Sequence, residues 1–262
     1  MSVQLRDLRL LGRSPALVHE LSSSLVISDV HLGYEDSMAS QGVYLPRLQL
    51  RRAKLIIDEA SKLGLRRIIV NGDLKHVFEK LTKGEKVEIA EFVRYAISKG
   101  FKDIVLVRGN HDTFVSQILR DFGVEVVEDY LDLGNGVLLT HGHKVVEGVR
   151  SGVTVIIGHE HPSLEINMAG AKVKLQVLLR APLKSGGELI VLPAVSLYQT
   201  GTSVTPSPDT YLSPITKELA VLEEAVPIIV DREIGVVELP PLKELLVAGH
   251  FRPRPPSASH QR

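Results

Sequence analysis

Arg108-Gly109-Asn110-His111-Asp112 directly follows the apolar run Ile104-Val105-Leu106-Val107, which has the pattern of a buried β-strand. Its glycine permits a tight turn or a close approach of the backbone. Its asparagine offers a neutral amide oxygen to a hard cation, and His111 can donate a proton or contact a phosphate. Asp112 is expected to hold the ring of His111 in one orientation. This stretch therefore has the chemistry of a functional strand end.

Four other predicted strands end in groups of the same kind. The groups are Asp29-x-His31, Gly72-Asp73, His141 and His159-x-His161. Ligands collect beyond the carboxyl ends of strands in open α/β sheets, so we expect all five clusters to converge on one site. Residues at positions i and i+2 of an extended segment point to the same side, so D-x-H and H-x-H can each present two ligands if they remain extended.

The convergent groups form a candidate metal-ligand set without any thiol. The set is Asp29, His31, Asp73, Asn110, His141, His159 and His161. Mixed oxygen and imidazole ligands favour Mn²⁺, Zn²⁺, Fe, Co²⁺ or Ni²⁺ over a soft metal. These residues are too many for one tetrahedral ion, but they suffice for two ions if one carboxylate bridges.

The apolar pattern predicts alternating strands and helices up to about residue 161. Helices are expected over residues 47–63, 85–98 and 114–122, and strands over 67–70, 103–107, 137–140 and 153–157. Residues 36–46 have no clear periodicity. After residue 162 we expect short strands, at 164–168, 172–179, 188–192, 226–231 and 234–239. The Thr-, Ser- and Pro-rich residues 199–214 are expected to form a long surface loop.

Composition limits the class of protein. The 262 residues contain 31 basic and 31 acidic side chains, which argues against a broad nucleic-acid-coating surface but leaves a local basic patch open. The absence of cysteine excludes a disulfide framework and thiolate metal sites. No apolar run approaches the ~18 residues of a membrane span, so we expect a soluble, cytoplasmic protein. We expect one domain over residues 1–247 and a disordered tail over 248–262.

The ordered motifs D-x-H, G-D, G-N-H-D, H-G and G-H-x-H, between residues 29 and 161, resemble the calcineurin-like metallophosphoesterase superfamily. The resemblance implies an α/β fold, a four-layer α/β/β/α sandwich with two mixed β-sheets. It also implies that Asp73 bridges two metal ions and that His111 is a catalytic histidine. The further ligands implied for one ion are Asp29, His31 and His161, and those for the other are Asn110, His141 and His159.

The second motif departs from the G-D-x-x-D of many relatives, because His76 stands where they have an aspartate. Histidine at this position resembles the SbcD-type exonuclease branch, where it lies beside the scissile phosphate. This favours a phosphodiester substrate, although the chain after residue 162 is too short for that branch's separate DNA-capping domain. The alternative is that His76 only caps the following turn.

Two other residues have competing interpretations. His143 competes with His141 for the ligand position; His141 is preferred because it directly follows its strand, which leaves His143 a supporting or substrate-contacting role. Arg108 either neutralises a surface carboxylate or contacts a substrate phosphate.

We therefore expect a dinuclear metal-dependent phosphoesterase with two divalent ions, Mn²⁺ before the others, about 3.5–4 Å apart. The expected substrates are small or single-stranded phosphodiesters, such as nucleotides or short single-stranded nucleic acid. We expect no association with a membrane. His76, His111 and Asp112 are the expected catalytic residues. The alternatives are a phosphomonoesterase, a cyclic-nucleotide phosphodiesterase, and a non-catalytic interaction scaffold, which the complete ligand set disfavours. The absence of a G-x-x-x-x-G-K-[ST] motif argues against a P-loop motor.

Overall fold

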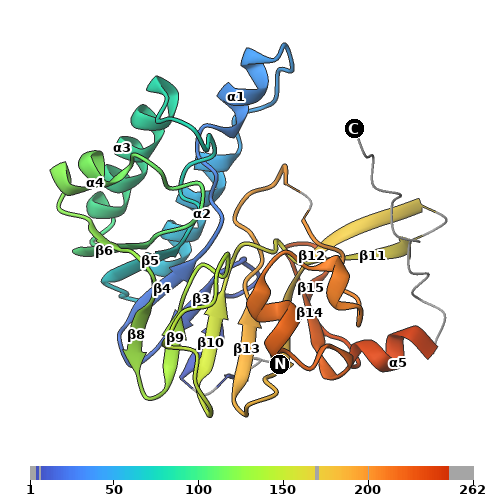
Figure 1. Cartoon of the computed structure of the whole chain (residues 1–262). Coiled ribbons are helices and arrows are strands. Elements are labelled where there is room, and N and C mark those ends of the chain that lie inside the picture. Colours follow the sequence, from blue (N-terminus) through green and yellow to red (C-terminus); the bar gives the residue numbers. More distant parts are fainter. Residues whose placement is uncertain (1–3, 6, 169–170, 200, 248–262) are drawn as a thin grey trace.

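A computed structural model describes residues 4–5, 7–168, 171–199 and 201–247, and the predicted tail at 248–262 lies outside these residues (Figure 1). The first sheet has the strand order β1-β2-β3-β4-β5-β6-β7. It is antiparallel from β1 to β4 and parallel from β4 to β7, and is therefore mixed. Its strands are β1 (Gln4–Leu5), β2 (Leu8–Leu10), β3 (Leu17–His19), β4 (Ser24–Ile27), β5 (Arg67–Asn71), β6 (Asp103–Val107) and β7 (Glu125–Val127).

The second sheet has the order β15-β14-β12-β13-β10-β9-β8, and β11 pairs only with β12. Strands β9, β10 and β13 run parallel, whereas β8, β12, β14 and β15 pair antiparallel with their neighbours. Its strands are β8 (Leu131–Gly134), β9 (Val137–Leu139), β10 (Thr154–Ile157), β11 (Ser163–Met168), β12 (Ala171–Pro182), β13 (Glu188–Val191), β14 (Val226–Asp231) and β15 (Gly235–Glu238).

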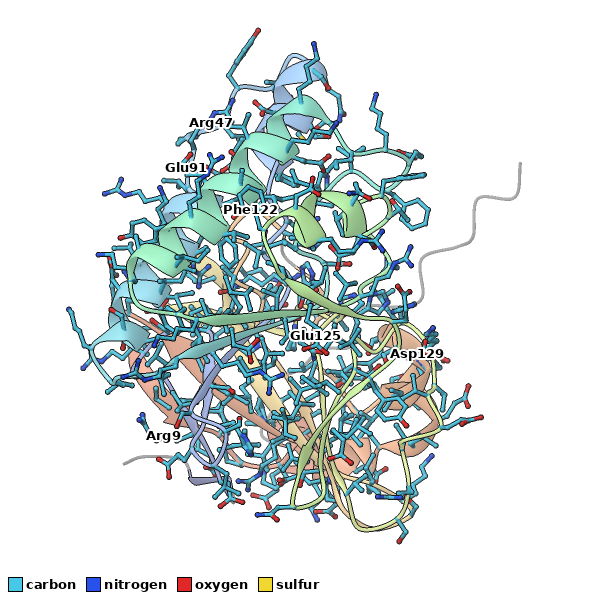
Figure 2. All side chains as sticks on the ribbon, turned by 90° about the vertical axis from the view of Figure 1, so that its left-hand side faces the viewer. Arg9, Arg47, Glu91, Phe122, Glu125 and Asp129 are labelled. Atoms are coloured by element: carbon cyan, nitrogen blue, oxygen red, sulfur yellow. The ribbon has the colours of Figure 1, made fainter. Side chains whose placement is uncertain are left out.

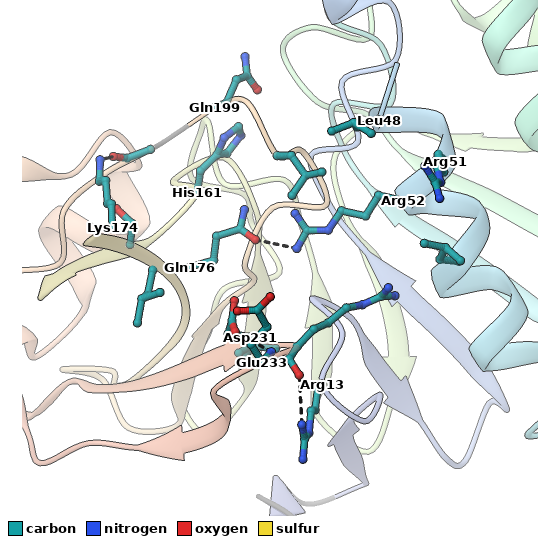
Figure 3. Close-up of a pocket in the computed structure, with 17 residues that line it drawn as sticks. Arg13, Leu48, Arg51, Arg52, His161, Lys174, Gln176, Gln199, Asp231 and Glu233 are labelled. Carbon is teal, nitrogen blue, oxygen red and sulfur yellow. Dashed lines mark hydrogen bonds between the residues drawn. The ribbon is translucent and has the colours of Figure 1, made fainter. Parts of the chain in front are cut away.

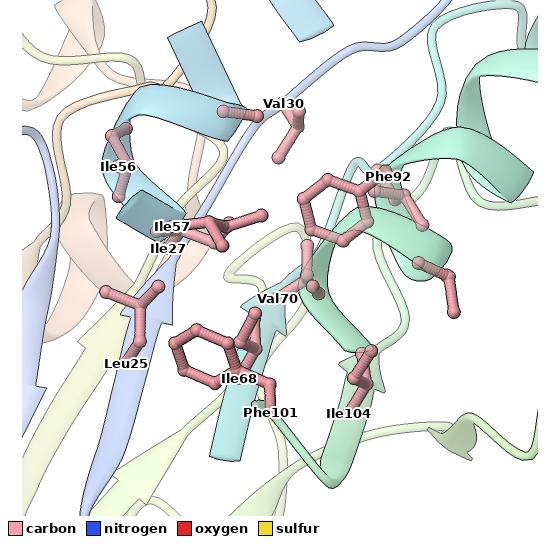
Figure 4. Close-up of a cluster of buried hydrophobic side chains, with 14 of the residues drawn as sticks. Leu25, Ile27, Val30, Ile56, Ile57, Ile68, Val70, Phe92, Phe101 and Ile104 are labelled. Carbon is pink, nitrogen blue, oxygen red and sulfur yellow. The ribbon is translucent and has the colours of Figure 1, made fainter. Parts of the chain in front are cut away.

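Helices cover the outer face of the first sheet. They are α1 (Tyr34–Ser40), α2 (Gln49–Ser61), α3 (Lys83–Ser98) and α4 (Ser116–Asp121). Ile56 and Ile57 of α2 and Phe92 of α3 pack with Leu25 and Ile68 of the sheet in a buried apolar cluster (Figure 4). The charged side chains of Arg47 and Glu91 lie at the surface of this helical layer (Figure 2). Burial of one apolar face of α2 and of α3 thus fixes these helices on the sheet, whereas the one buried side chain of α1 is that of Glu35.

A second apolar cluster fills the space between the two sheets, with Val26, Ile69 and Val105 from one sheet facing Leu139 and Ile156 from the other. A third cluster lies on the outer face of the second sheet. There the cover consists of short helical pieces: Pro208–Thr210, Ile215–Leu219, Leu222–Glu224 and α5 (Leu242–Val247). The predicted four-layer α/β/β/α sandwich with two mixed sheets is therefore confirmed, with a thin outermost layer.

One helix was not predicted, and one local prediction was wrong. The aperiodic stretch 36–46 begins inside α1, which is held by a tertiary contact: the Glu35 carboxylate accepts hydrogen bonds from the backbone N–H groups of Leu48 and Gln49 at the start of α2. The predicted surface loop 199–214 is partly core, because Tyr211 and Val204 are buried against the second sheet. The described helices include none that is long and apolar enough to cross a membrane.

Asn71 joins the two sheets beside the carboxyl ends of their parallel strands. Its buried side-chain amide lies at the end of β5 and donates hydrogen bonds to the carbonyl oxygens of Thr140, at 3.0 Å, and Ile156, at 3.2 Å. These carbonyls belong to the ends of β9 and β10 in the opposite sheet. A buried polar bridge of this kind helps to fix the relative position of the two sheets, because each buried carbonyl would otherwise lose a donor; that of Ile156 would then keep, among the described residues, only the backbone N–H of Thr140, at 3.1 Å.

We predict that Asn71→Ala lowers the free energy of unfolding by about 2 to 3 kcal/mol, because two hydrogen bonds are lost and buried carbonyl groups lose a donor. Equilibrium unfolding in urea measures this loss. Gln117→Ala, which removes an exposed amide from α4, is the control and should stay within about 0.5 kcal/mol of the wild type. Equal stability of the two variants would contradict the bridging role.

Candidate metal centre

The structure brings the seven predicted ligands together at the carboxyl ends of five strands. Asp29 and His31 follow β4, Asp73 follows β5, and Asn110 follows β6. The second sheet supplies the remaining three: His141 after β9, and His159 and His161 after β10. The site therefore lies where the ends of both sheets meet.

Asp29, His31 and His161 form one group of ligand atoms. Oδ1 of Asp29 lies 3.1 Å from Nε2 of His161, and Nε2 of His31 lies 3.2 Å from the same nitrogen. Asp29 and His31 are almost fully buried.

Asp73, His141 and His159 form the second group. Nε2 of His141 lies 3.3 Å from Oδ2 of Asp73 and 3.1 Å from Oδ1 of Asn110. Nδ1 of His141 is 3.0 Å from the carbonyl oxygen of Asn71, which accepts its proton. This bond leaves the Nε2 lone pair directed at the group, as in metal-binding histidines.

Asp73 belongs to the second group and also faces the first. Its Oδ2 is 3.3 Å from His141 Nε2 and 3.7 Å from His31 Nε2, while its Oδ1 accepts a hydrogen bond from the backbone N–H of His111. One oxygen is therefore held by the backbone, and the other faces both ligand groups.

These spacings suit metal coordination. Two ligands bound to one ion at 2.0–2.2 Å are separated by about 3.0 Å in octahedral and about 3.4 Å in tetrahedral geometry. The separations around His161 and His141, from 3.1 to 3.3 Å, match this range. The donor set and its geometry thus fit two divalent ions.

The electrostatics of the site depend on two buried carboxylates, those of Asp29 and Asp73. Burial raises the pKa of Asp29, but the charge of His161 and its hydrogen bond outweigh burial and lower the pKa to about 2. Burial opposes protonation of His141, yet the charge of Asp73 raises the pKa of that imidazole to about 10. Burial and the positive charge of His141 lower the pKa of His159 to about 4. Each half of the site therefore holds an anion surrounded by imidazoles, an arrangement that cations stabilise.

The ligand pairs do not use the expected extended backbone. Five predicted ligands have positive φ: Asp29 (55°), His31 (51°), Asp73 (53°), His159 (68°) and His161 (46°). Non-glycine residues rarely adopt this left-handed conformation, which concentrates at functional sites. Asp29 and His31, like His159 and His161, still reach a common site, but they do so by turning sharply out of the sheet.

Gly109 and Gly158 are required for close packing. A Cβ at Gly109 would collide with the carboxylate and the backbone nitrogen of Asp73, and one at Gly158 would collide with Ser28 and Asp29. Neither glycine has positive φ, so close approach rather than turn geometry explains them.

The prediction that Asp112 orients the ring of His111 was wrong. The buried Asp112 carboxylate accepts hydrogen bonds from the backbone N–H groups of Asp73, Leu74 and Gly109, at 2.7–2.9 Å. Burial and the nearby charge of Asp73 raise its pKa to about 6. Asp112 is thus a positioning residue for two ligand-bearing loops, and the carbonyl oxygen of His76 accepts the Nδ1 proton of His111.

His76 and His111 line the centre on the side of His31. The rings of His76 and His111 are stacked, with centroids 5.8 Å apart, and lie 5.5 and 5.1 Å from the ring of His31. Burial, followed by the charge of His111, lowers the pKa of His76. His76 therefore belongs to the centre rather than to a remote turn.

His143 and Arg108, the two residues with competing interpretations, lie in different surroundings. His143 lies beside the second group, with its ring centroid 5.5 Å from that of His141 and 6.3 Å from that of His159. Arg108 instead forms an ion pair with Glu128 at 2.7 Å on the surface, which agrees with the alternative that it neutralises a carboxylate.

Sequence reasoning missed two buried charged residues that support the centre. The ammonium group of Lys75 donates to the carbonyl oxygens of Val77 and Lys80 and so shapes the loop after His76. Glu160 accepts hydrogen bonds from the backbone N–H groups of Leu212 and Ser213, and so joins the H-x-H segment to a distant loop. The only available signal was their position inside the motifs, since their partners are not recognisable from local sequence.

Comparisons with known proteins agree with this geometry. A family model described as calcineurin-like phosphoesterase matches residues 23–163, which include every predicted ligand. A search of the curated proteins finds no match.

Among solved structures, this chain is similar to the nuclease MPE of Pseudomonas putida, with a TM-score of 0.62 and 20% identity over 91% of this chain and 99% of that chain. It is more distantly similar to Yfce, a phosphoesterase from E. coli, with a TM-score of 0.41 and 18% identity over 66% of this chain and 80% of that chain. The family match covers more than half of the chain. The chain therefore belongs to the calcineurin-like phosphoesterase family, hydrolases that use divalent metal ions to cleave phosphoester bonds.

Proposed function

We propose that this chain is a dinuclear metal-dependent phosphodiesterase that hydrolyses small or single-stranded phosphodiesters. The observation that carries the proposal is the position of Asp73, whose Oδ2 faces His31 on one side and His141 on the other. A carboxylate shared between two ligand groups is the arrangement that a two-metal hydrolase requires.

The proposed ligands divide into two sets that share Asp73. One set is Asp29, His31, Asp73 and His161, and the other is Asp73, Asn110, His141 and His159. Oxygen and neutral imidazole donors favour Mn²⁺, with Zn²⁺, Fe, Co²⁺ and Ni²⁺ as alternatives. When bound, such a pair of ions lowers the pKa of a coordinated water and neutralises charge on the phosphoryl oxygens.

His111 is the proposed proton donor to the leaving oxygen. Its Nδ1 proton is engaged by the carbonyl oxygen of His76, so Nε2 is the nitrogen available to a substrate. Its backbone N–H donates to the carboxylate of Asp73 at 2.9 Å, which keeps the ring beside the centre. The rings of His31, His76 and His111 also form a third group of candidate ligand atoms, and we assign His111 to proton transfer rather than to metal binding. Asp112 contributes indirectly, because it fixes the backbone on both sides of this contact.

His76 supports a diester rather than a monoester substrate. Burial favours its neutral imidazole, which repels any approaching phosphate less than the aspartate found in many relatives would, so the preference for a diester rests on the hydrogen bond that the ring can donate. An imidazole N–H can also donate a hydrogen bond to a non-bridging oxygen. The Pseudomonas putida protein with the same fold is a nuclease, which agrees with diester chemistry. His143, whose ring lies 5.5 Å from that of His141, is the proposed substrate contact beside the second ligand group.

We predict that His111→Gln binds both metal ions and keeps the fold but loses about 10²- to 10⁴-fold in kcat, because only proton transfer is removed. Elemental analysis of metal-saturated protein, circular dichroism and steady-state kinetics with Mn²⁺ measure the three properties. Loss of metal would make His111 a ligand, and unchanged turnover would exclude it as the proton donor.

We also predict a higher kcat/KM on bis-p-nitrophenyl phosphate than on p-nitrophenyl phosphate with Mn²⁺. His76→Asp should shift this ratio towards the monoester, because a carboxylate cannot supply the imidazole N–H that we propose binds a non-bridging oxygen of the diester. His76→Asn has nearly the same shape as the aspartate without its charge, and should shift the ratio less. A wild-type preference for the monoester would refute the diester assignment and leave the metal centre unaffected.

A further inference from the structure

A groove of ≈ 490 Å³ opens beside the metal centre and includes the ligand His161 in its wall (Figure 3). Helix α2 forms one side of the groove, with Arg51 and Arg52. Strand β12 forms the other side, with Lys174 and Gln176, and the turn after β14 contributes Arg232. The groove is thus built from segments far apart in the sequence.

Positive charge is concentrated in this groove. Its walls contain five basic side chains, Arg13, Arg51, Arg52, Lys174 and Arg232, and two acidic ones, Asp231 and Glu233. The whole chain, by contrast, has equal numbers of basic and acidic residues. Among the described residues, the ion pairs within 4.0 Å include none of the four arginines. The groove therefore has more basic than acidic side chains, and its arginines are not engaged in these ion pairs.

Arg52 is held in position within the groove. Its Nη2 donates a hydrogen bond to Oε1 of Gln176 at 2.8 Å, and Gln176 in turn donates to the carbonyl oxygens of Ala194 and Ser196 (Figure 3). Burial, followed by the positive charge of Arg232, lowers the pKa of Arg52 to about 10. A preoriented guanidinium beside a second cation is suited to phosphate, because its N–H groups match the phosphate oxygens.

The groove and the metal centre form one continuous surface. Gln199 lines the groove, and its Nε2 lies 3.4 Å from Nδ1 of His76. Next to it, the ring of Tyr198 stacks on that of Tyr34 at 5.6 Å, and Tyr34 contacts His76. A basic groove adjoining aromatic rings is typical of proteins that bind single-stranded nucleic acid.

From these observations we propose that the groove binds the phosphates next to the cleaved bond of a single-stranded nucleic acid. This inference rests on the proposed phosphodiesterase function and specifies its substrate. A small diester at the metal centre would not reach the arginines of the groove, whereas a strand passing over His76 and His161 brings its next phosphates to Arg51, Arg52 and Arg232.

The test compares the double variant Arg51→Gln/Arg232→Gln with the control Arg66→Gln/Arg120→Gln. Both remove two exposed arginines and the same charge, but the control residues lie outside the groove. Fluorescence anisotropy of a labelled twelve-residue oligothymidylate without added metal measures binding directly. The ratio of kcat/KM on this oligonucleotide to that on bis-p-nitrophenyl phosphate measures use of the groove during turnover.

The groove variant should bind the oligonucleotide about tenfold more weakly or worse. The slope of the logarithm of its association constant against the logarithm of salt concentration should be smaller in magnitude by about 1.4, as expected for two lost phosphate contacts. The kinetic ratio should fall to a similar extent, and the control should match the wild type. Equal binding by the two variants would overturn the inference, as would tripolyphosphate competing as well as the oligonucleotide, since the groove would then hold a small polyphosphate. Failure to hydrolyse bis-p-nitrophenyl phosphate would instead count against the proposed function, because the binding measurement does not depend on turnover.

Discussion

Oδ2 of Asp73 lies within 3.7 Å of histidine nitrogens on both of its sides, in a place that solvent scarcely reaches. A buried carboxylate is costly unless hydrogen bonds and opposite charges compensate it. The charge and hydrogen bond of His141, followed by the charge of His31, provide this compensation. Asp112 has a different role, because it accepts hydrogen bonds from the backbone N–H groups of Asp73 and Gly109 and so fixes the loops after β5 and β6 together. The backbone N–H of His111 donates a hydrogen bond to the other carboxylate oxygen of Asp73, Oδ1. The position of this one carboxylate therefore determines both ligand groups.

The site also depends on the contact between the two sheets. His31 belongs to the first sheet and His141 to the second, so the space between their nitrogens follows from how the sheets are placed. Asn71 controls that placement, because its amide donates to carbonyls of the second sheet while its own carbonyl accepts the Nδ1 proton of His141. Left-handed backbone at Asp73 and His159 completes the geometry. Strain of this kind persists only where the surrounding structure enforces it, which here is the packing of both sheets.

The sequence was sufficient to predict the strand ends and the residues that meet there, because apolar runs followed by Asp, Asn or His are visible locally. It was insufficient for the direction of individual side chains. Asp112 was assigned to the ring of His111, although its carboxylate points to backbone N–H groups that no motif reveals. Helix α1 was missed because it is short and depends on the contact from Glu35 to the start of α2. The balanced charge of the chain left a local basic patch open, but its place could not be predicted, since Arg13, Arg51 and Arg232 come from separate segments.

The most direct test of this account is anomalous X-ray diffraction from crystals grown with Mn²⁺, for the wild type and for Asp73→Ala. The account predicts two anomalous peaks in the wild type, one within reach of Asp29, His31 and His161 and the other of Asn110, His141 and His159, with the carboxylate of Asp73 touching both. It predicts that Asp73→Ala loses at least one peak while the fold persists. A single wild-type peak, or two peaks of which only one contacts Asp73, would contradict the claim that this carboxylate joins two metal sites.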